Sequence, residues 1–243
     1  NHEDLLLQFY NKSKLFKDFG NVWFNGNGGQ ETIASFTSSK EVLAKVFEVS
    51  SFSDRIGRNF EPEHFRPDDK YMDFFNNLQY SHIEEYDMND YSQGDPPLKF
   101  AFVHAGLNAD LDIEEQLSIK TYNDFHTYCK ENNIWIEDTT IWTRSEPSKR
   151  FGDYIVVHGH TPTNTLPNYY KQLANYDAAS GMPYFRFENP DERSYNEYKT
   201  TVLSQNIRKL VSINMDTGSA FGYKLTALGI DYLSLVSGEL MTV

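Results

Sequence analysis

The sequence predicts an α/β protein, because apolar runs suited to buried strands alternate with segments of helical periodicity. Three of these runs share one layout: each is rich in β-prone residues and ends abruptly in a polar residue followed by small ones. They occupy residues 98–103, 154–157 and 210–215. Such runs are typical of buried strands whose carboxyl ends open into tight loops, and ligands of α/β sheets bind at those ends.

Helices are predicted to dominate the N-terminal third of the chain. From residue 4 to residue 18, apolar side chains recur close to a helical stripe. A cluster of Asn and Gly at residues 25–29 is typical of a turn. Shorter helical segments are then predicted at residues 31–36, 40–49 and 71–78.

The segment from about residue 164 to residue 208 is rich in Tyr, Asn and charged residues and has no clear period. It is interpreted as an insertion, which forms either a cap beside the site or a surface elaboration. No repeat, low-complexity tract or Pro/Gly linker marks a domain boundary in the sequence. We therefore expect a single domain over residues 1–243.

Composition and charge disfavour several classes of function. The net charge is −13 and no basic cluster is present, which argues against binding to duplex nucleic acid. The single cysteine, Cys129, rules out a disulfide framework or a multi-cysteine zinc site within this chain. No apolar run in the sequence approaches the roughly 18 residues needed to cross a bilayer. We therefore expect a cytoplasmic protein that binds neither nucleic acid nor membranes.

Two histidines stand just beyond predicted strands. His104 directly follows the first run, and His160 lies shortly after the second. A lone histidine at such a place is usually a hydrogen-bonded cap of the strand. Two of them at the same edge favour a metal site, because imidazole is the commonest nitrogen ligand for zinc, iron and similar ions. His158 lies on the opposite side of the extended chain and is interpreted as a core residue or a support for the ligands.

Four short motifs occur along the chain, and two further positions accompany them. The motifs are Asn1-His2-Glu3, His104-Ala105-Gly106, Gly159-His160-Thr161 and Asp216-Thr217-Gly218, and the further positions are Gln116 and Trp142-Thr143-Arg144. In this order they resemble the later motifs of calcineurin-like metallophosphoesterases, in the phosphoprotein-phosphatase (serine/threonine phosphatase) branch. That family reads G-N-H-E or G-N-H-D, then H-A-G or H-G-G, then G-H-T.

The resemblance implies a four-layer sandwich of two mixed β-sheets flanked by helices. It also implies two divalent ions, manganese, iron or zinc, which activate a shared water for in-line phosphoryl transfer. Asn1, His104 and His160 correspond to ligands of one ion. His2 corresponds to the acid that protonates the leaving group, and Arg144 to the arginine that grips the phosphoryl oxygens.

The family has two motifs upstream of the one that Asn1 begins. We therefore expect a preceding N-terminal segment that supplies a bridging aspartate, the other metal ligands and the first strands of the sheet. Without those strands, sheet edges would be exposed and backbone groups left unpaired. Residues 1–243 alone are expected to be inactive and unable to hold two metals.

Hydrolysis of a phosphoric ester is the predicted reaction, with a phosphoserine or phosphothreonine protein as the leading substrate class. A symmetrical dinucleoside tetraphosphate hydrolase uses the same metals and is the alternative within the family. A non-catalytic binding module derived from a phosphoesterase is the alternative from another class. The sequence leaves these alternatives and the oligomeric state open.

The Asp216-Thr217-Gly218 motif is also the local signature of aspartic proteases. Those enzymes need two carboxylates that share one proton, hence two such loops or a short chain that dimerises with the motif near its start. This chain has one copy, near its end. The motif is therefore interpreted as a structural turn after a strand.

Overall fold

The computed structural model describes residues 1–12, 19–47, 62–87, 96–145, 150–165, 183–188, 207–222, 225–230 and 241–242. The chain divides into two compact units. A helical unit comprises residues 1–79 and 120–135, and a sheet unit comprises residues 80–119 and 136–243. The single domain expected over the whole chain stays a prediction, because two compact units can belong to one domain.

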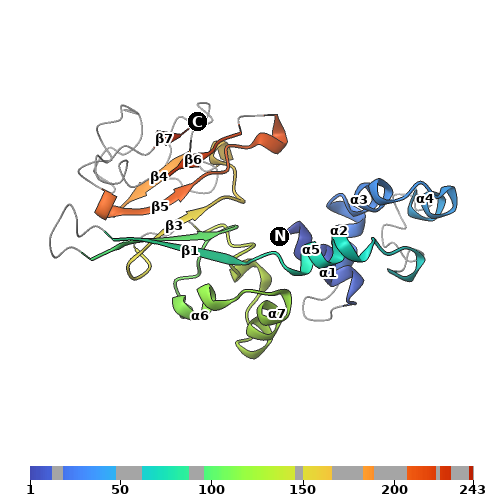
Figure 1. The fold of residues 1–243 in the computed structure, drawn as a ribbon, viewed down its shortest axis with the longest axis horizontal. Helices are drawn as coiled ribbons and strands as arrows, with labels where there is room; N and C mark the ends of the chain where they lie inside the picture. The colour runs from blue at the N-terminus through green and yellow to red at the C-terminus, as the bar shows by residue number, and fades with distance from the viewer. Residues whose placement is uncertain are drawn as a thin grey trace. The chain divides into compact units, whose positions relative to one another are not determined.

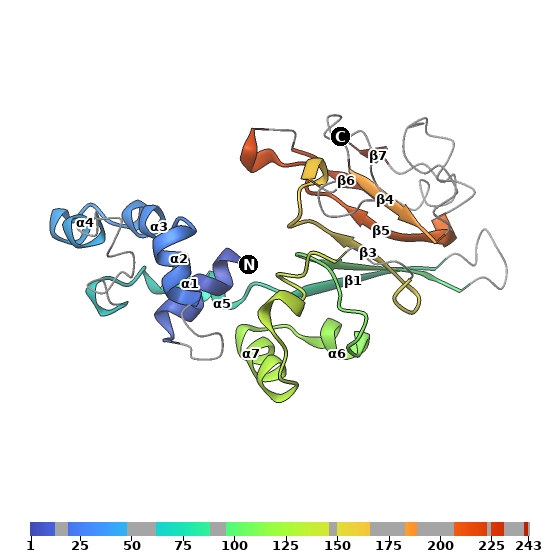
Figure 2. The same cartoon turned by 180° about the vertical axis from the view of Figure 1, so that it is seen from behind.

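Short helices build the helical unit (Figures 1 and 2). They are α1 (His2–Tyr10), α2 (Phe19–Gly26), α3 (Gly29–Phe36), α4 (Lys40–Phe47), α5 (Asp69–Asn76) and α7 (Tyr122–Glu131), with a 3-10 turn, η1, at Pro62–His64. α1 packs against α2 and α5, while α3 packs against α2 and α4. Glycine is required at the start of α3, since a Cβ on Gly29 would lie 2.6 Å from the Phe24 Cα.

The predicted helices are present, but their lengths differ from expectation. α1 ends at Tyr10, and Lys12 has a positive φ of 49° that does not continue a helix. The rest of the predicted helix, residues 13–18, lies outside the described residues. α2 and α7 were not predicted, although α7 carries a recognisable signal: Thr121 and Asp124 form a capping box.

A mixed five-stranded sheet organises the described part of the sheet unit (Figure 1). Its strands are β1 (Ser81–Tyr86), β2 (Leu98–Val103), β3 (Tyr154–His158), β4 (Tyr184–Phe187) and β5 (Leu210–Asn214), in the order β1-β2-β3-β5-β4. β2, β3 and β5 run parallel in the centre, whereas β1 and β4 are antiparallel edges. A separate ribbon pairs β6 (Leu228–Gly229) with β7 (Met241–Thr242). The predicted α/β class is confirmed.

The three predicted strands are the three parallel central strands, and the two edge strands were missed. β1 carries His82, Glu84 and Glu85, so it lacks the apolar run of a buried strand. β4 lies inside residues 164–208, the segment predicted to be an insertion, yet it pairs with β5 and completes the sheet. Residues 166–182 and 189–206 of that segment lie outside the described residues.

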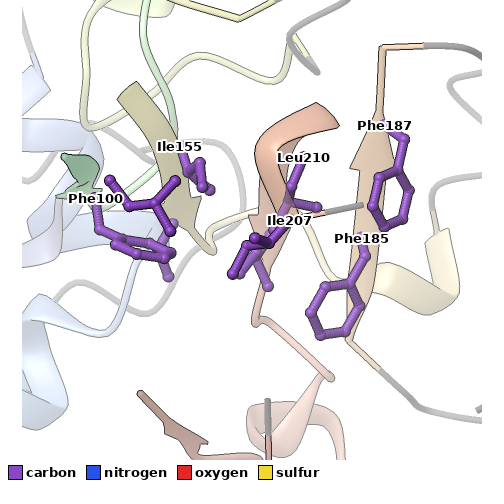
Figure 3. Close-up of a cluster of buried hydrophobic side chains, with 9 residues drawn as sticks. Phe100, Ile155, Phe185, Phe187, Ile207 and Leu210 are labelled. Atoms are coloured by element: carbon purple, nitrogen blue, oxygen red, sulfur yellow. The ribbon is translucent and has the colours of Figure 1, made fainter. Parts of the chain in front are cut away.

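Two apolar layers cover opposite faces of the sheet. The first gathers side chains from β2, β3, β4, β5 and the 3-10 helix η6 (Ile207–Lys209) (Figure 3), namely Leu98, Phe100, Ile155, Val157, Phe185, Phe187, Ile207, Leu210 and Ile213. The second lies under α6 (Ile113–Ser118) and gathers Ala101, Val103, Leu107, Leu117, Phe151, Tyr154 and Val156. Packing on both faces holds the parallel strands rigidly, so the residues at their carboxyl ends have defined positions.

Candidate metal and phosphate site

The parallel pairing of β2, β3 and β5 brings three loops to one edge of the sheet. In the register, Phe102 stands beside Val157, and His158 stands beside Asn214. The loops that begin at residues 104, 159 and 215 therefore start side by side. This is the juxtaposition that the three strand-then-loop segments predicted.

Backbone hydrogen bonds join these loops to one another. The Gly159 amide donates to the His104 carbonyl at 2.8 Å, and the Met215 amide donates to the His158 carbonyl at 2.7 Å. The Thr163 amide donates to the Asp216 carbonyl, also at 2.7 Å. The loop edge is thus a connected backbone scaffold rather than three independent turns.

The His104 and His160 imidazoles lie next to each other on this scaffold. Their ring centroids are 5.2 Å apart and the ring planes are inclined by 59°. With metal–nitrogen bonds of about 2.0–2.1 Å, each ring centroid lies about 3.2 Å from the ion, and two rings at a tetrahedral angle are about 5.3 Å apart. The observed separation therefore fits two ligands of one ion.

His160 has a strained backbone. Its φ is 66°, and the Thr161 amide donates to the Gly159 carbonyl at 2.7 Å, so a γ-turn is centred on this histidine. Residues other than glycine rarely adopt positive φ, and such conformations cost on the order of 1–3 kcal/mol. Strain of this kind concentrates at functional sites, where the surrounding structure holds it in place.

The Trp142-Thr143-Arg144 segment adjoins the histidine pair through its tryptophan. The Trp142 and His160 ring centroids are 5.5 Å apart and the planes meet at 81°, an edge-to-face contact. Arg144 follows two residues later on an exposed stretch of chain. Its predicted role as a phosphate ligand stays a prediction.

The small residues after His104 pass close to the loop that contains Trp142. The Thr140 carbonyl accepts hydrogen bonds from the Ala105 and Gly106 amides, at 2.8 and 3.3 Å. Gly106 has a φ of 153°, and a Cβ there would lie 3.0 Å from the Thr143 Cγ2. Sequence reasoning missed Thr140, because its contribution is a backbone carbonyl, which any residue type supplies.

Gln116, which the sequence analysis singled out, organises the loop beyond Gly106. Its side chain is buried, and Oε1 accepts a hydrogen bond from the Asn108 amide at 2.9 Å. Nε2 donates to the carbonyls of Asn108 and Asp112, at 2.9 and 3.2 Å. One side chain therefore replaces the backbone partners that an irregular loop lacks.

Replacing Gln116 by alanine is expected to destabilise the protein by about 2 kcal/mol, because the partly buried Asn108 amide and carbonyl would lose their side-chain partner. Chemical denaturation of the wild type and of Gln116→Ala measures the difference. Ser118→Ala on the same helix is the matched control, since Ser118 is exposed and donates only to the carbonyl of Glu115. Equal stabilities of the two variants would contradict the assignment.

Asp216 forms a turn after β5, as its structural interpretation predicted. Its Oδ1 accepts a hydrogen bond from the Gly218 amide at 2.9 Å, and its own amide donates to the Asn214 Oδ1 at 3.0 Å. The buried Asn214 also donates from Nδ2 to the Thr161 carbonyl at 3.0 Å. Asn214 thus links two loops of the site, and its place at the end of an apolar run was the signal that sequence reasoning overlooked.

The remaining predicted site residues are Asn1, His2 and His158. Asn1 and His2 begin α1 in the helical unit, where His2 is exposed. Their relation to the His104–His160 pair stays a prediction, because that pair belongs to the sheet unit. His158 is buried on β3, with Nδ1 at 3.4 Å from the Gly159 carbonyl, which agrees with a core residue.

The helical unit contains a buried polar cluster that sequence reasoning did not identify. The Asp4 carboxylate accepts a hydrogen bond from the Gln8 Nε2 at 2.6 Å, and its other oxygen lies 3.2 Å from the His126 Nε2. These contacts join α1 to α7. An acidic residue four positions before a glutamine on an apolar helix face was the available signal.

The Cys129 thiol is buried beside this cluster and is expected to be unreactive. Burial, together with the nearby Asp4 carboxylate, raises the pKa of the thiol to about 12. Only the thiolate is a strong nucleophile, so the native protein at pH 8 should not react with a disulfide reagent such as DTNB. Release of one thiolate equivalent in denaturant but none in buffer checks this. Rapid reaction of the native protein would contradict the burial.

Two further properties concern only the described residues. No group of three or more His, Cys, Asp or Glu side chains gathers there in a way that would hold a metal. The predicted ligand set instead combines two histidines with the Asn1 amide and an upstream aspartate. Every helix within those ranges is too short or too polar to span a bilayer.

Comparisons with protein-family models, with curated proteins and with solved structures found no match. The resemblance to metallophosphoesterases therefore rests on the sequence motifs and stays a prediction.

Proposed function

We propose that this chain belongs to a metal-dependent phosphoric-ester hydrolase of the calcineurin-like type that acts on phosphoserine or phosphothreonine proteins. The His104–His160 pair is the observation that carries this proposal. The two imidazoles come from adjacent parallel strands, and their centroid separation of 5.2 Å fits two ligands on one ion. The left-handed backbone of His160 adds support, because strain of this kind concentrates at functional sites.

In this proposal each residue has a role suited to its chemistry. His104, His160 and the Asn1 amide hold one of two divalent ions, manganese, iron or zinc. The ions, when bound, lower the pKa of a shared water and offset charge on the phosphoryl oxygens. Arg144 orients the phosphate through its planar guanidinium group, and His2 donates a proton to the leaving oxygen.

A second β-sheet is part of the proposal. A metallophosphoesterase has two mixed sheets in a four-layer sandwich, of which the five-stranded sheet would be one. The sheet face that carries Phe100, Phe185 and Phe187 also packs against Leu228 of β6. An apolar face with strand residues against it supports a second sheet on that side, while α6 supplies the helical layer on the other.

Phosphate release by the full-length protein tests the proposal. A phosphothreonine peptide and diadenosine tetraphosphate are compared at equal concentration, with Mn²⁺, with Zn²⁺ and with EDTA. We expect metal-dependent turnover that is faster on the peptide and is abolished by the chelator. Faster turnover of the tetraphosphate would reject the substrate class, and metal binding without turnover of either substrate would favour the binding module.

A further inference from the structure

The position of Trp142 relative to His160 suggests a role that the motif alone does not assign. The indole meets the imidazole edge to face, with centroids 5.5 Å apart, while the His104 ring lies 5.2 Å from that same imidazole. His160 is therefore in contact with an aromatic ring and with its proposed partner ligand at once. The orientation of the His160 ring is therefore restricted by the Trp142 indole on one side and by the His104 imidazole on another.

The backbone that carries Trp142 is firmly anchored. The Trp142 and Thr143 amides both donate to the Thr139 carbonyl, at 3.2 and 2.9 Å. The neighbouring side chains of Ile141 and Thr143 are buried, and the Thr140 carbonyl is bonded to the loop that follows His104. The segment that carries the indole is thus anchored to the same loop that carries His104.

An imidazole needs such a neighbour if it is to face a metal. Rotation about the bond to the ring is broad, so a half-buried histidine samples several orientations unless a packed group restricts it. Groups behind a metal ligand that fix its orientation commonly change metal affinity. An edge-to-face aromatic contact has a defined geometry and therefore provides such a restriction.

We propose that Trp142 is a positioning residue that holds the His160 imidazole toward His104 and so prepares the pair for a divalent ion. This inference rests on the proposed metal site. The tryptophan also reports on that site, because an ion held by His160 would lie close to the indole. The other two tryptophans, Trp23 and Trp135, belong to the helical unit.

Binding of Zn²⁺ and Co²⁺ to the full-length protein, measured by calorimetry, tests this role. Trp142→Leu is expected to weaken binding about three- to ten-fold, the range set by one edge-to-face contact. Trp142→Phe, which keeps an aromatic edge, should restore affinity to within about two-fold of the wild type. Trp135→Leu is the control, because Trp135 is exposed, and it should bind as the wild type does. Circular dichroism confirms that each variant is folded.

Fluorescence and NMR keep this test separate from that of the metal site. Co²⁺ should quench the wild type, and most of that quenching should disappear in Trp142→Phe although the ion still binds. In metal-free protein the imidazole resonances of His160 should shift in Trp142→Leu while those of His82 stay unchanged. Unchanged affinity in Trp142→Leu, with binding lost in His160→Ala, would overturn the positioning role alone. Absence of metal binding in the wild type and in every variant would overturn the proposed function. In that case, unchanged His160 resonances in Trp142→Leu would overturn the positioning role as well.

Discussion

Replacing His160 by alanine is expected to lower both divalent-metal affinity and phosphatase turnover of the full-length protein by more than about 100-fold. Loss of a hydrogen-bonded partner behind a metal ligand already costs about 10- to 100-fold, and His160 is proposed to be a ligand itself. The imidazole is one of two that fit the same ion, so His104 alone would be left from the sheet unit. Calorimetry with Mn²⁺ and Zn²⁺ and phosphate release from a phosphopeptide measure the two effects.

The strained turn makes a second substitution at this position informative. His160→Gly removes the same imidazole but suits a φ of 66°. Its free energy of unfolding should therefore exceed that of His160→Ala by roughly 1 kcal/mol, and it should melt at a higher temperature. Metal binding should be lost in both variants. His82→Ala is the control, since His82 is exposed on the edge strand β1 and pairs with Glu84. Full metal binding by His160→Gly would disprove the ligand role.

Phe100→Ala is expected to cause the largest loss of stability, about 4 kcal/mol. Phe100 is fully buried in the middle of β2 and belongs to the apolar layer shared by four strands (Figure 3). Truncating a buried phenylalanine to alanine typically costs 3–5 kcal/mol, because apolar contacts are lost and a cavity remains. Urea denaturation followed by far-UV circular dichroism measures the change.

Phe221→Ala provides the comparison, because Phe221 is 72 % exposed and its removal should alter stability by less than about 0.5 kcal/mol. The two substitutions remove the same type of side chain, so the predicted difference in stability loss comes from burial. A loss below about 1.5 kcal/mol in Phe100→Ala would show that the sheet unit repacks around the cavity. Such a small loss would argue against a rigid core in the sheet unit.

Burial explains which strands the sequence revealed. β2 and β3 contribute to both apolar layers and every residue of β5 is buried, so their sequences are mainly apolar runs that stand out from their surroundings. β1 and β4 lie at the edges of the described sheet, where each pairs with a single strand, and β1 carries charged residues in place of an apolar run. Tyr184–Phe187 is short and mostly aromatic, and its strand partner among the described residues is β5.

The candidate site shows the same division between local and distant causes. His104 and His160 were predicted because each follows a buried strand, and adjacency of parallel strands brings such residues together. The positive φ of His160 was not predictable, since histidine usually avoids that conformation and the γ-turn depends on neighbouring loops. The contact with Trp142 and the carbonyl of Thr140 likewise arise from tertiary structure.

The order of strands in the sheet has a consequence for how the protein folds. Each antiparallel edge pair closes a short stretch of chain, as in the pairing of Tyr86 with Leu98. The parallel ladders instead join residues more than about fifty positions apart, β2 to β3 and β3 to β5. Contacts so distant in sequence form slowly, because the chain must first lose the entropy of a long loop. The edge pairs should thus form early and the central ladders late. The two imidazoles would then come together only near the end of folding, so a divalent ion would bind and stabilise the fully folded protein alone.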